Sequence, residues 1–239
     1  MLPEMDLPSQ PPPDVPAPPP GPEAIRSRRV MKCILWLGGI SMVFILGIFI
    51  TRALIPGHPI PPRTEAISNI RQIGLNLFAF EEDYGRFPDA ATIPAVQART
   101  GTTLALGSGS SNQLFRQLIA TGTKSEMIFW AKTFTTRGKP NDVMGADTLL
   151  PGDCAFTYIA GLTSTSNPDA PILMTPVVPG TWKFDPKPLK GKAVVFFTDS
   201  SATALPIDKN GDVILNGMNL FDPRQPFWGG KLPDIKWPE

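Results

Sequence analysis

The sequence contains few of the residues that most enzymes and disulfide-bonded domains depend on. It has one histidine, His58, and two cysteines, Cys33 and Cys154. Cys33 opens a long apolar segment and Cys154 lies far downstream, so the two cannot pair if that segment spans a membrane. His58 falls in a proline-rich stretch, and no zinc-type or dinucleotide-binding pattern occurs. We therefore predict no catalytic residue, no metal site and no cofactor, and a buried structural position for Cys154.

An excess of either charge is also lacking. Lys and Arg total 22 and Asp and Glu total 21, which gives a formal net charge of +1. A nucleic-acid-binding protein needs a strongly basic face to neutralise phosphates. The composition therefore argues against nucleic acid as a partner.

Residues 1–29 have almost nothing with which to build a core. Prolines recur from Pro3 to Pro22, there is no aromatic side chain, and the first basic residue is Arg26. Such a segment buries too little apolar surface to offset its chain entropy. We predict a disordered, proline-rich cytoplasmic tail, which either docks as polyproline on a partner or stays passively solvated.

The longest apolar run follows directly. Cys33 to Ile50 is 18 residues without a charge, close to the length that a bilayer requires. We predict a transmembrane helix over residues 30–54, anchored by Cys33, Trp36, Phe44 and Ile50. The basic residues before it predict a cytoplasmic N-terminus by the positive-inside rule; they are Arg26, Arg28, Arg29 and Lys32. A cleaved signal peptide is the alternative, but the basic flank and the apolar run are both long for one.

Prolines and glycine at residues 55–63 predict a stiff linker before an exported domain of residues 64–239. Thr64 is a candidate N-cap of a helix that ends near Gly85. Its apolar residues recur at steps of three and four, as an amphipathic helix requires; they are Ile67, Ile70, Gly74, Leu77 and Phe78. A second helix is expected from Ser111.

The remaining sequence predicts mainly strands. Residues 155–162 and 171–178 flank a polar turn and suggest an antiparallel pair, and 193–198 is an apolar run suited to a central strand. Residues 202–207 lead through Asn210-Gly211, a strong turn pattern, to 212–215. The C-terminal tail is expected to be irregular. The predicted fold class is α+β, with an amphipathic helix packed on an antiparallel β-sheet.

One helical segment carries a resemblance to a known family. Residues 69–75 read NIRQIGL and residues 84–88 read YGRFP. With the basic flank, the apolar helix and the strands, they resemble the type IV pilin-like superfamily, and most closely type II secretion pseudopilin-like proteins of the planctomycete–verrucomicrobial kind. The positions that match are Arg71, Gln72, Gly74, Tyr84, Gly85, Phe87 and Pro88.

The resemblance implies a pilin-like fold and a structural or assembly role. It also implies that the protein crosses the bacterial inner membrane once and that its C-terminal domain is periplasmic. It implies envelope or secretion-machinery proteins as partners. Gly39 is not followed by the Glu of mature pilins, and prolines at 56–62 interrupt the continuous pilin helix, which favours an anchored, non-polymerising form. The alternative is an exported module that binds a glycan or peptide through aromatics near Trp182, Trp228 and Trp237; an enzyme ranks last.

Overall fold

The computed structural model describes Trp36, Leu37, Gly39, Ser41, Met42 and residues 60–239. The first five are helical and exposed, and residues 60–239 form a separate compact unit, described here by itself. Within the described residues, no helix is both long and apolar enough to span a bilayer. Several predictions lie outside the described residues: the tail of residues 1–29, His58, and the residues Arg26, Arg28, Arg29, Lys32, Cys33, Phe44 and Ile50.

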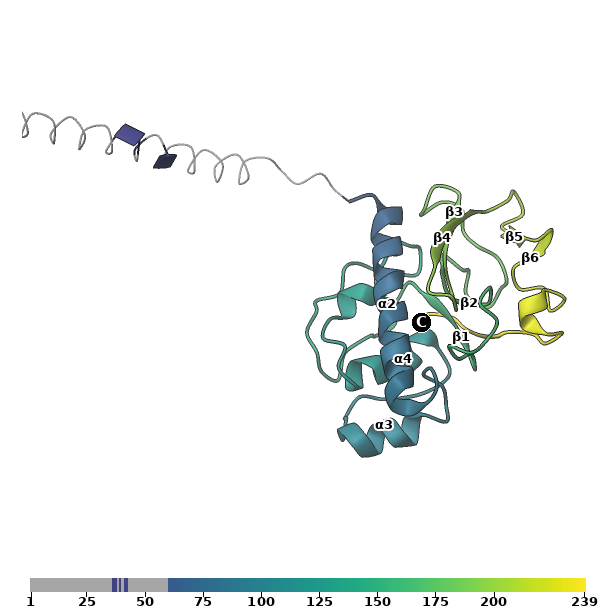
Figure 1. Ribbon diagram of the computed structural model, residues 1–239, viewed down its shortest axis with the longest axis horizontal. Helices are drawn as coiled ribbons and strands as arrows, with labels where there is room; N and C mark the ends of the chain where they lie inside the picture. Colours follow the sequence, from purple (N-terminus) through teal and green to yellow (C-terminus); the bar gives the residue numbers. More distant parts are fainter. Residues whose placement is uncertain (1–35, 38, 40, 43–59) are drawn as a thin grey trace, which may run out of the picture. The chain divides into compact units, whose positions relative to one another are not determined.

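The unit of residues 60–239 is α+β, as predicted (Figure 1). Its α-helices are α2 (Pro62–Tyr84), α3 (Ile93–Thr100) and α4 (Ser111–Ala120). Two short 3-10 helices are η1 (Glu126–Phe129) and η2 (Pro226–Trp228). The helices of the first half precede all of the strands.

A five-stranded antiparallel sheet has the order β4-β3-β2-β1-β7. Its strands are β1 (Thr157–Ala160), β2 (Pro171–Thr175), β3 (Lys192–Phe197), β4 (Ala202–Pro206) and β7 (Asp234–Lys236). A two-stranded ribbon of β5 (Ile214–Leu215) and β6 (Met218–Asn219) lies outside that sheet. The predicted pairing of β1 with β2, and the interior place of β3, are both confirmed.

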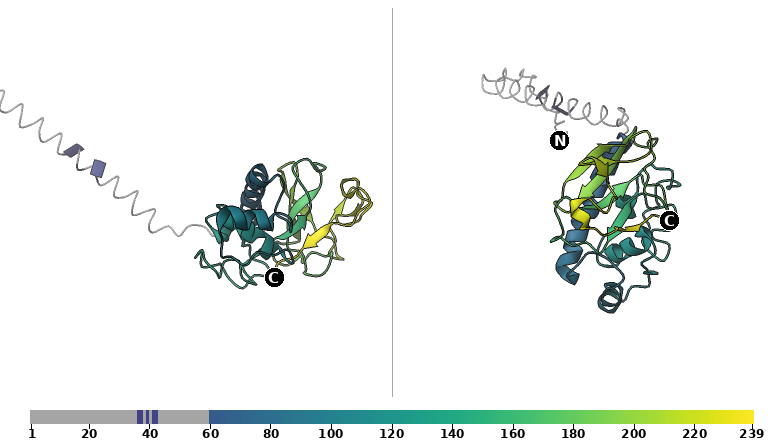
Figure 2. Two further views of the ribbon diagram at one scale, coloured as in Figure 1. Left: turned by 90° about the horizontal axis from the view of Figure 1, so that it is seen from below. Right: turned by 90° about the vertical axis from the view of Figure 1, so that its right-hand side faces the viewer.

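The sheet separates two hydrophobic cores. The α-helices lie on one face of the sheet and the C-terminal segments lie on the other (Figure 2). Successive side chains of a strand point to opposite faces, and β3 follows this rule. Val194 and Phe196 join the core beneath α2 and α4, whereas Ala193 and Val195 join the core covered by the C-terminal segments. Both faces of the central strands are therefore covered.

The helix α2 begins three residues earlier than predicted, with Pro61 in place of Thr64 as its N-cap. Pro62 stands at its first position, and the carbonyl of Pro61 accepts the N–H groups of Thr64 and Glu65, so Thr64 is not the N-cap. Proline suits this position because the first N–H groups of a helix have no intrahelical acceptor. The last residues of the predicted linker, Pro62 and Arg63, thus belong to the helix. Its end at Gly85 agrees with the prediction.

Gly74 sets the distance between α2 and the sheet. A Cβ atom at this position would lie 2.1 Å from Cζ of Phe196 on β3. No side chain larger than hydrogen fits there unless the buried ring moves. Glycine in a helix interior costs stability through chain entropy, and here it permits the close approach of helix and strand.

The elements α3, η2 and β7 were not predicted. No expectation covered α3, which begins after a turn formed at Asp89. The C-terminal tail was expected to be irregular, and this prediction is wrong, because it contains η2 and the edge strand β7. Backbone pairing of β7 with β1, from Tyr158 opposite Lys236 to Ala160 opposite Asp234, forms this strand despite the surrounding Pro and Gly.

Candidate functional site

The segment Tyr84–Pro88 closes α2 and connects it to the sheet. Gly85 adopts a left-handed conformation with φ of 76°, which ends the helix at low steric cost. Phe87 is buried with its ring edge against Phe78, at 5.3 Å between centroids. The carbonyl of Pro88 accepts a 3.0 Å hydrogen bond from the hydroxyl of Tyr158 on β1. Burial raises the pKa of Tyr158, which keeps its hydroxyl protonated as the donor.

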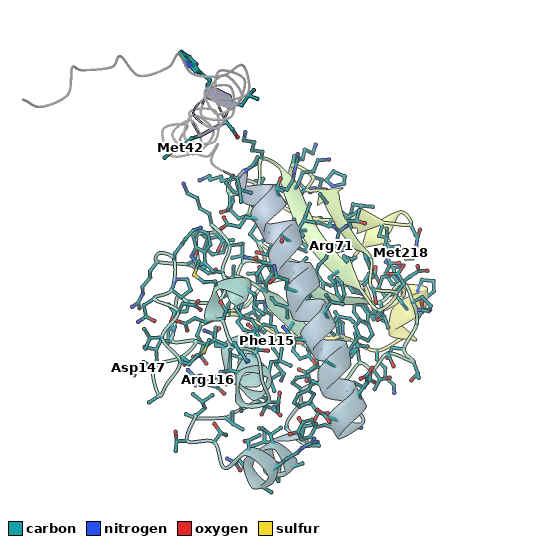
Figure 3. All side chains as sticks on the ribbon, turned by 60° about the vertical axis from the view of Figure 1, so that its left-hand side comes forward. Met42, Arg71, Phe115, Arg116, Asp147 and Met218 are labelled. Atoms are coloured by element: carbon teal, nitrogen blue, oxygen red, sulfur yellow. The ribbon has the colours of Figure 1, made fainter. Side chains whose placement is uncertain are left out.

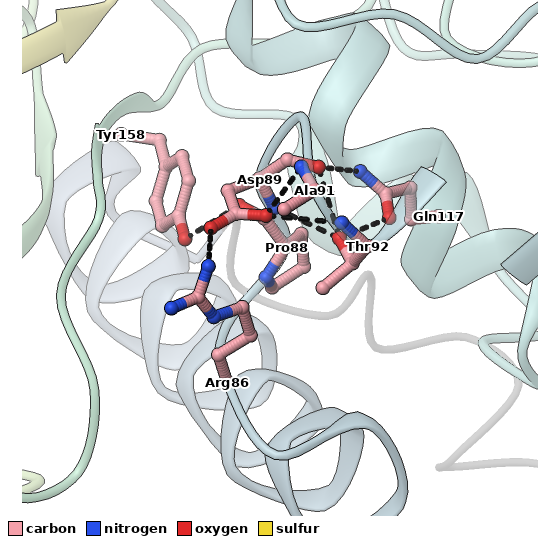
Figure 4. A network of polar contacts seen from close by, with 7 residues as sticks. All are labelled: Arg86, Pro88, Asp89, Ala91, Thr92, Gln117 and Tyr158. Atoms are coloured by element: carbon pink, nitrogen blue, oxygen red, sulfur yellow. Dashed lines mark hydrogen bonds and ion pairs between the residues drawn. The ribbon is translucent and has the colours of Figure 1, made fainter. Parts of the chain in front are cut away.

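A polar network continues from this segment into α4 (Figure 4). Asp89 accepts hydrogen bonds from the N–H groups of Ala91 and Thr92, at 2.8 and 3.0 Å, and pairs with Arg86 at 3.0 Å. Gln117 of α4 donates to the carbonyl of Asp89 at 3.0 Å and accepts from the Thr92 hydroxyl at 2.7 Å. The network fixes the chain between α2, α3 and α4, and its polar atoms are already bonded within the fold.

The residues that carry the family resemblance therefore divide into two groups. Gly74, Tyr84, Gly85, Phe87 and Pro88 form the junction between α2 and the sheet. Arg71 and Gln72 lie on the exposed side of α2 (Figure 3). The neighbouring Asn69 donates to the carbonyls of Met127 and Trp130, at 3.2 and 2.8 Å, and so holds η1 against the helix.

Two buried charged side chains, Arg116 and Glu126, each bind the backbone of the long loop between η1 and β1. Arg116 on α4 donates to the carbonyls of Thr148 and Leu149, at 3.1 and 3.0 Å. Glu126 accepts from the N–H groups of Leu149 and Asp142, at 3.1 and 3.2 Å. Burial raises the pKa of Glu126 above its ordinary value of 4.5. The backbone of the loop thus engages both of these ionisable side chains.

Cys154 is fully buried, as predicted. Its burial raises the pKa of the thiol to about 12, so the thiolate is not formed near neutral pH. In the described part of the chain, no group of three or more His, Cys, Asp and Glu side chains could hold a metal ion.

The three tryptophans of the alternative prediction do not form one aromatic patch. Trp182 is 45% exposed, whereas Trp228 is 7% exposed and donates its indole N–H to the carbonyl of Leu220. Trp237 is half-buried and donates to the carbonyl of Thr181 at 3.2 Å. Of the three, Trp182 is the most exposed.

Trp182 instead borders a polar groove of 370 Å³. Lys183 follows Trp182 in the chain, and the other lining residues come from the turn before β5, from β6 and from the segment after β6; they are Asp212, Asn219, Asp222, Pro223 and Arg224. Sequence reasoning missed these polar residues because the fold brings them beside Trp182 from distant positions. Two other hollows, of 230 Å³ between α2 and α4 and of 290 Å³ beside β7, lack an exposed aromatic ring.

Comparison with known proteins identified no relative of this chain. No protein-family model matches the chain, and neither a curated protein nor a solved structure matches it.

Proposed function

We propose that the protein is a membrane-anchored, pilin-like component of the bacterial cell envelope that acts as a structural or assembly protein. In this proposal residues 30–54 cross the inner membrane, the proline-rich tail lies in the cytoplasm, and the domain that begins at α2 is periplasmic. Its partners are other envelope proteins, in type II secretion or type IV pilus-like machinery.

One observation carries the proposal. Residues that resemble the pseudopilin pattern place α2 against an antiparallel sheet and close the end of this helix. Gly74 permits the close approach to Phe196, and Gly85 ends the helix where Phe87 enters the core. A helix lying on an antiparallel sheet, after an apolar and basic-flanked segment, is the arrangement that the resemblance implies.

Contacts between proteins, rather than catalysis, are the proposed mode of action. The buried polar side chains that might do acid–base chemistry are used for structure: Glu126 accepts two backbone N–H groups, and Arg116 donates to loop carbonyls. The exposed side of α2, with Arg71, Gln72 and the 68% exposed Leu75, is a candidate contact surface. A side chain of this size and exposure is available to a partner.

N-terminal sequencing of the protein extracted from membranes tests the proposal. We expect an intact N-terminus with the proline-rich tail present, in a fraction that resists alkaline extraction. A new N-terminus at Ile40, directly after Gly39, would instead indicate prepilin-type processing and would contradict the non-polymerising form. Recovery of the mature protein in the soluble fraction would contradict the anchor itself.

A further inference from the structure

Trp182 lies on a turn whose backbone is fixed by several hydrogen bonds. The N–H of Val178 donates to the carbonyl of Lys183 at 2.8 Å, and the N–H of Thr181 donates to the carbonyl of Val178 at 3.1 Å. The indole of Trp237 donates to the carbonyl of Thr181 at 3.2 Å, from the opposite side of the turn. The backbone that carries Trp182 is therefore held at the edge of the groove, and the ring, which is 45% exposed, is available for contact with a ligand.

The floor of the groove is an organised polar cluster. Lys183 donates to both carboxylate oxygens of Asp212, at 2.7 and 2.8 Å, and the amide of Asn219 donates to the same carboxylate at 2.7 Å. Asp208 accepts the N–H of Asp212 at 2.8 Å and so orients that residue from below. The ammonium group of Lys183 and the carboxylate of Asp212 remain accessible in part, since their side chains are 48% and 16% exposed.

A second ion pair, between Asp222 and Arg224, lines the same groove. Arg224 donates to Asp222 through Nε at 3.0 Å and through Nη2 at 2.6 Å. These hydrogen bonds lower the pKa of Asp222 to about 2, so the pair stays ionised across the physiological range. Among the residues that the structure describes, none accepts a hydrogen bond from Nη1 of Arg224, which leaves this donor for a ligand.

The groove therefore offers one aromatic face and balanced charge. Two carboxylates, of Asp212 and Asp222, are each matched by one cation. The two pairs leave the groove without a net charge that would favour a charged ligand, and an uncharged ligand with many hydroxyl groups can bond to them as they stand. Sugars have this character, because a pyranose ring presents a C–H face for stacking and hydroxyls around its rim. Charge-assisted hydrogen bonds to those hydroxyls are stronger than neutral ones.

We propose that the groove between Trp182, Asp212 and Arg224 is a binding site for a neutral oligosaccharide. The indole of Trp182 stacks on one sugar ring, and the Lys183–Asp212 and Asp222–Arg224 pairs bond its hydroxyls. The site is shallow and open, so binding is in the range of weak recognition modules. It gives the envelope protein a glycan contact that is independent of its membrane anchor and of its protein partners.

Saturation-transfer NMR with the full-length chain tests the site. The protein is kept in a detergent without a sugar headgroup, because alkyl glycosides would compete. The probes are neutral di- to tetrasaccharides of glucose, galactose, mannose and N-acetylglucosamine, with trigalacturonate as an anionic comparison. We expect saturation of C–H protons on one sugar ring of at least one neutral probe and a weaker response from the anion.

Variants assign the binding to the groove. Trp182→Ala should raise the dissociation constant at least tenfold, which corresponds to a loss of about 1.4 kcal/mol in binding free energy. Trp182→Phe should retain part of the affinity. Phe134→Ala is the matched control, because Phe134 is an exposed aromatic, at 48%, that does not line the groove. Circular dichroism checks that each variant folds.

Three results would overturn the proposal. They are no transfer to any neutral probe, an affinity that Trp182→Ala leaves unchanged, or equal or tighter binding of trigalacturonate. None of these results bears on the anchor, since binding is measured irrespective of topology.

Discussion

Gly74 is the residue on which the contact between α2 and the sheet depends. Gly74→Ala adds a methyl group 2.1 Å from the Phe196 ring, and overpacking of a core costs about 1–3 kcal/mol. Alanine regains about 1 kcal/mol through helix propensity. We predict a net loss of up to about 2 kcal/mol in the free energy of unfolding, measured by urea denaturation.

The neighbouring position provides the control for this prediction. Leu75→Ala changes an exposed side chain of the same helix and should alter stability by no more than about 0.5 kcal/mol. The loss caused by Gly74→Ala should shrink in a Phe196→Leu background, where the ring is absent. An equal loss in both backgrounds would show that Gly74 does not act through Phe196.

The raised pKa of Glu126 predicts that the free energy of unfolding falls as the pH rises above 4.5. Its pKa is raised by burial in the folded protein above 4.5, so as the pH rises past this value the unfolded chain ionises first. The unfolded state then binds fewer protons, and the free energy of unfolding falls until the pH passes the raised pKa. Below pH 4.5 the carboxyl is protonated in both states and contributes no pH dependence.

Glu126→Gln isolates this contribution. The amide NH₂ of Gln must face one of the two backbone N–H groups that Glu126 accepts, which costs about 1–3 kcal/mol. The stability advantage of the parent protein over the variant should be largest near pH 4.5 and should shrink as the pH rises. An advantage that grows with pH in paired denaturation curves would contradict the assignment.

At the scale of elements, β7 depends on contacts distant in sequence. Ile235 is its buried residue and packs into the core on the C-terminal side of the sheet. Ile235→Ala should lower the free energy of unfolding by about 2–4 kcal/mol, measured by thermal or chemical denaturation. Leu232→Ala, at an exposed position just before β7, should change it by less than about 0.5 kcal/mol. Similar effects of the two changes would mean that β7 contributes little to the sheet.

This difference between local and distant contacts explains which elements the sequence predicts. The helical period of Ile70, Gly74 and Leu77 and the apolar run of β3 are local patterns, so α2 and β3 were predicted. The start of α3 depends on the Asp89 turn and its contact with Gln117, and β7 depends on β1. No periodicity within either segment indicates such partners.

At the scale of the whole molecule, the groove beside Trp182 also depends on contacts distant in sequence that local patterns do not predict. The sequence drew attention to Trp182 through its aromatic ring, and to Asn210-Gly211 through its turn pattern. It did not indicate that Asp212, Asn219 and Arg224 would converge on Trp182, because turns and the crossover to β7 bring them together. Trp228 does not join Trp182 in an exposed aromatic patch, because it packs into the core, where its apolar area stabilises the fold.

Single-cysteine variants can report on which side of the membrane the tail and the domain lie. Cys154 is buried and its thiol pKa is about 12, so it should not react with a maleimide in the folded protein. A Cys33→Ser background therefore leaves little labelling. Lys209→Cys then places a thiol on an exposed turn of the domain, and Ser9→Cys places one in the proline-rich tail.

Labelling of spheroplasts with a membrane-impermeant maleimide tests the central claim most directly. We predict that Lys209→Cys reacts in intact spheroplasts, and that Ser9→Cys reacts only after the membrane is opened. Replacing Arg26, Arg28, Arg29 and Lys32 with Glu should reduce or reverse this asymmetry, since the basic flank sets the orientation. Reaction of Lys209→Cys only after lysis would contradict the account.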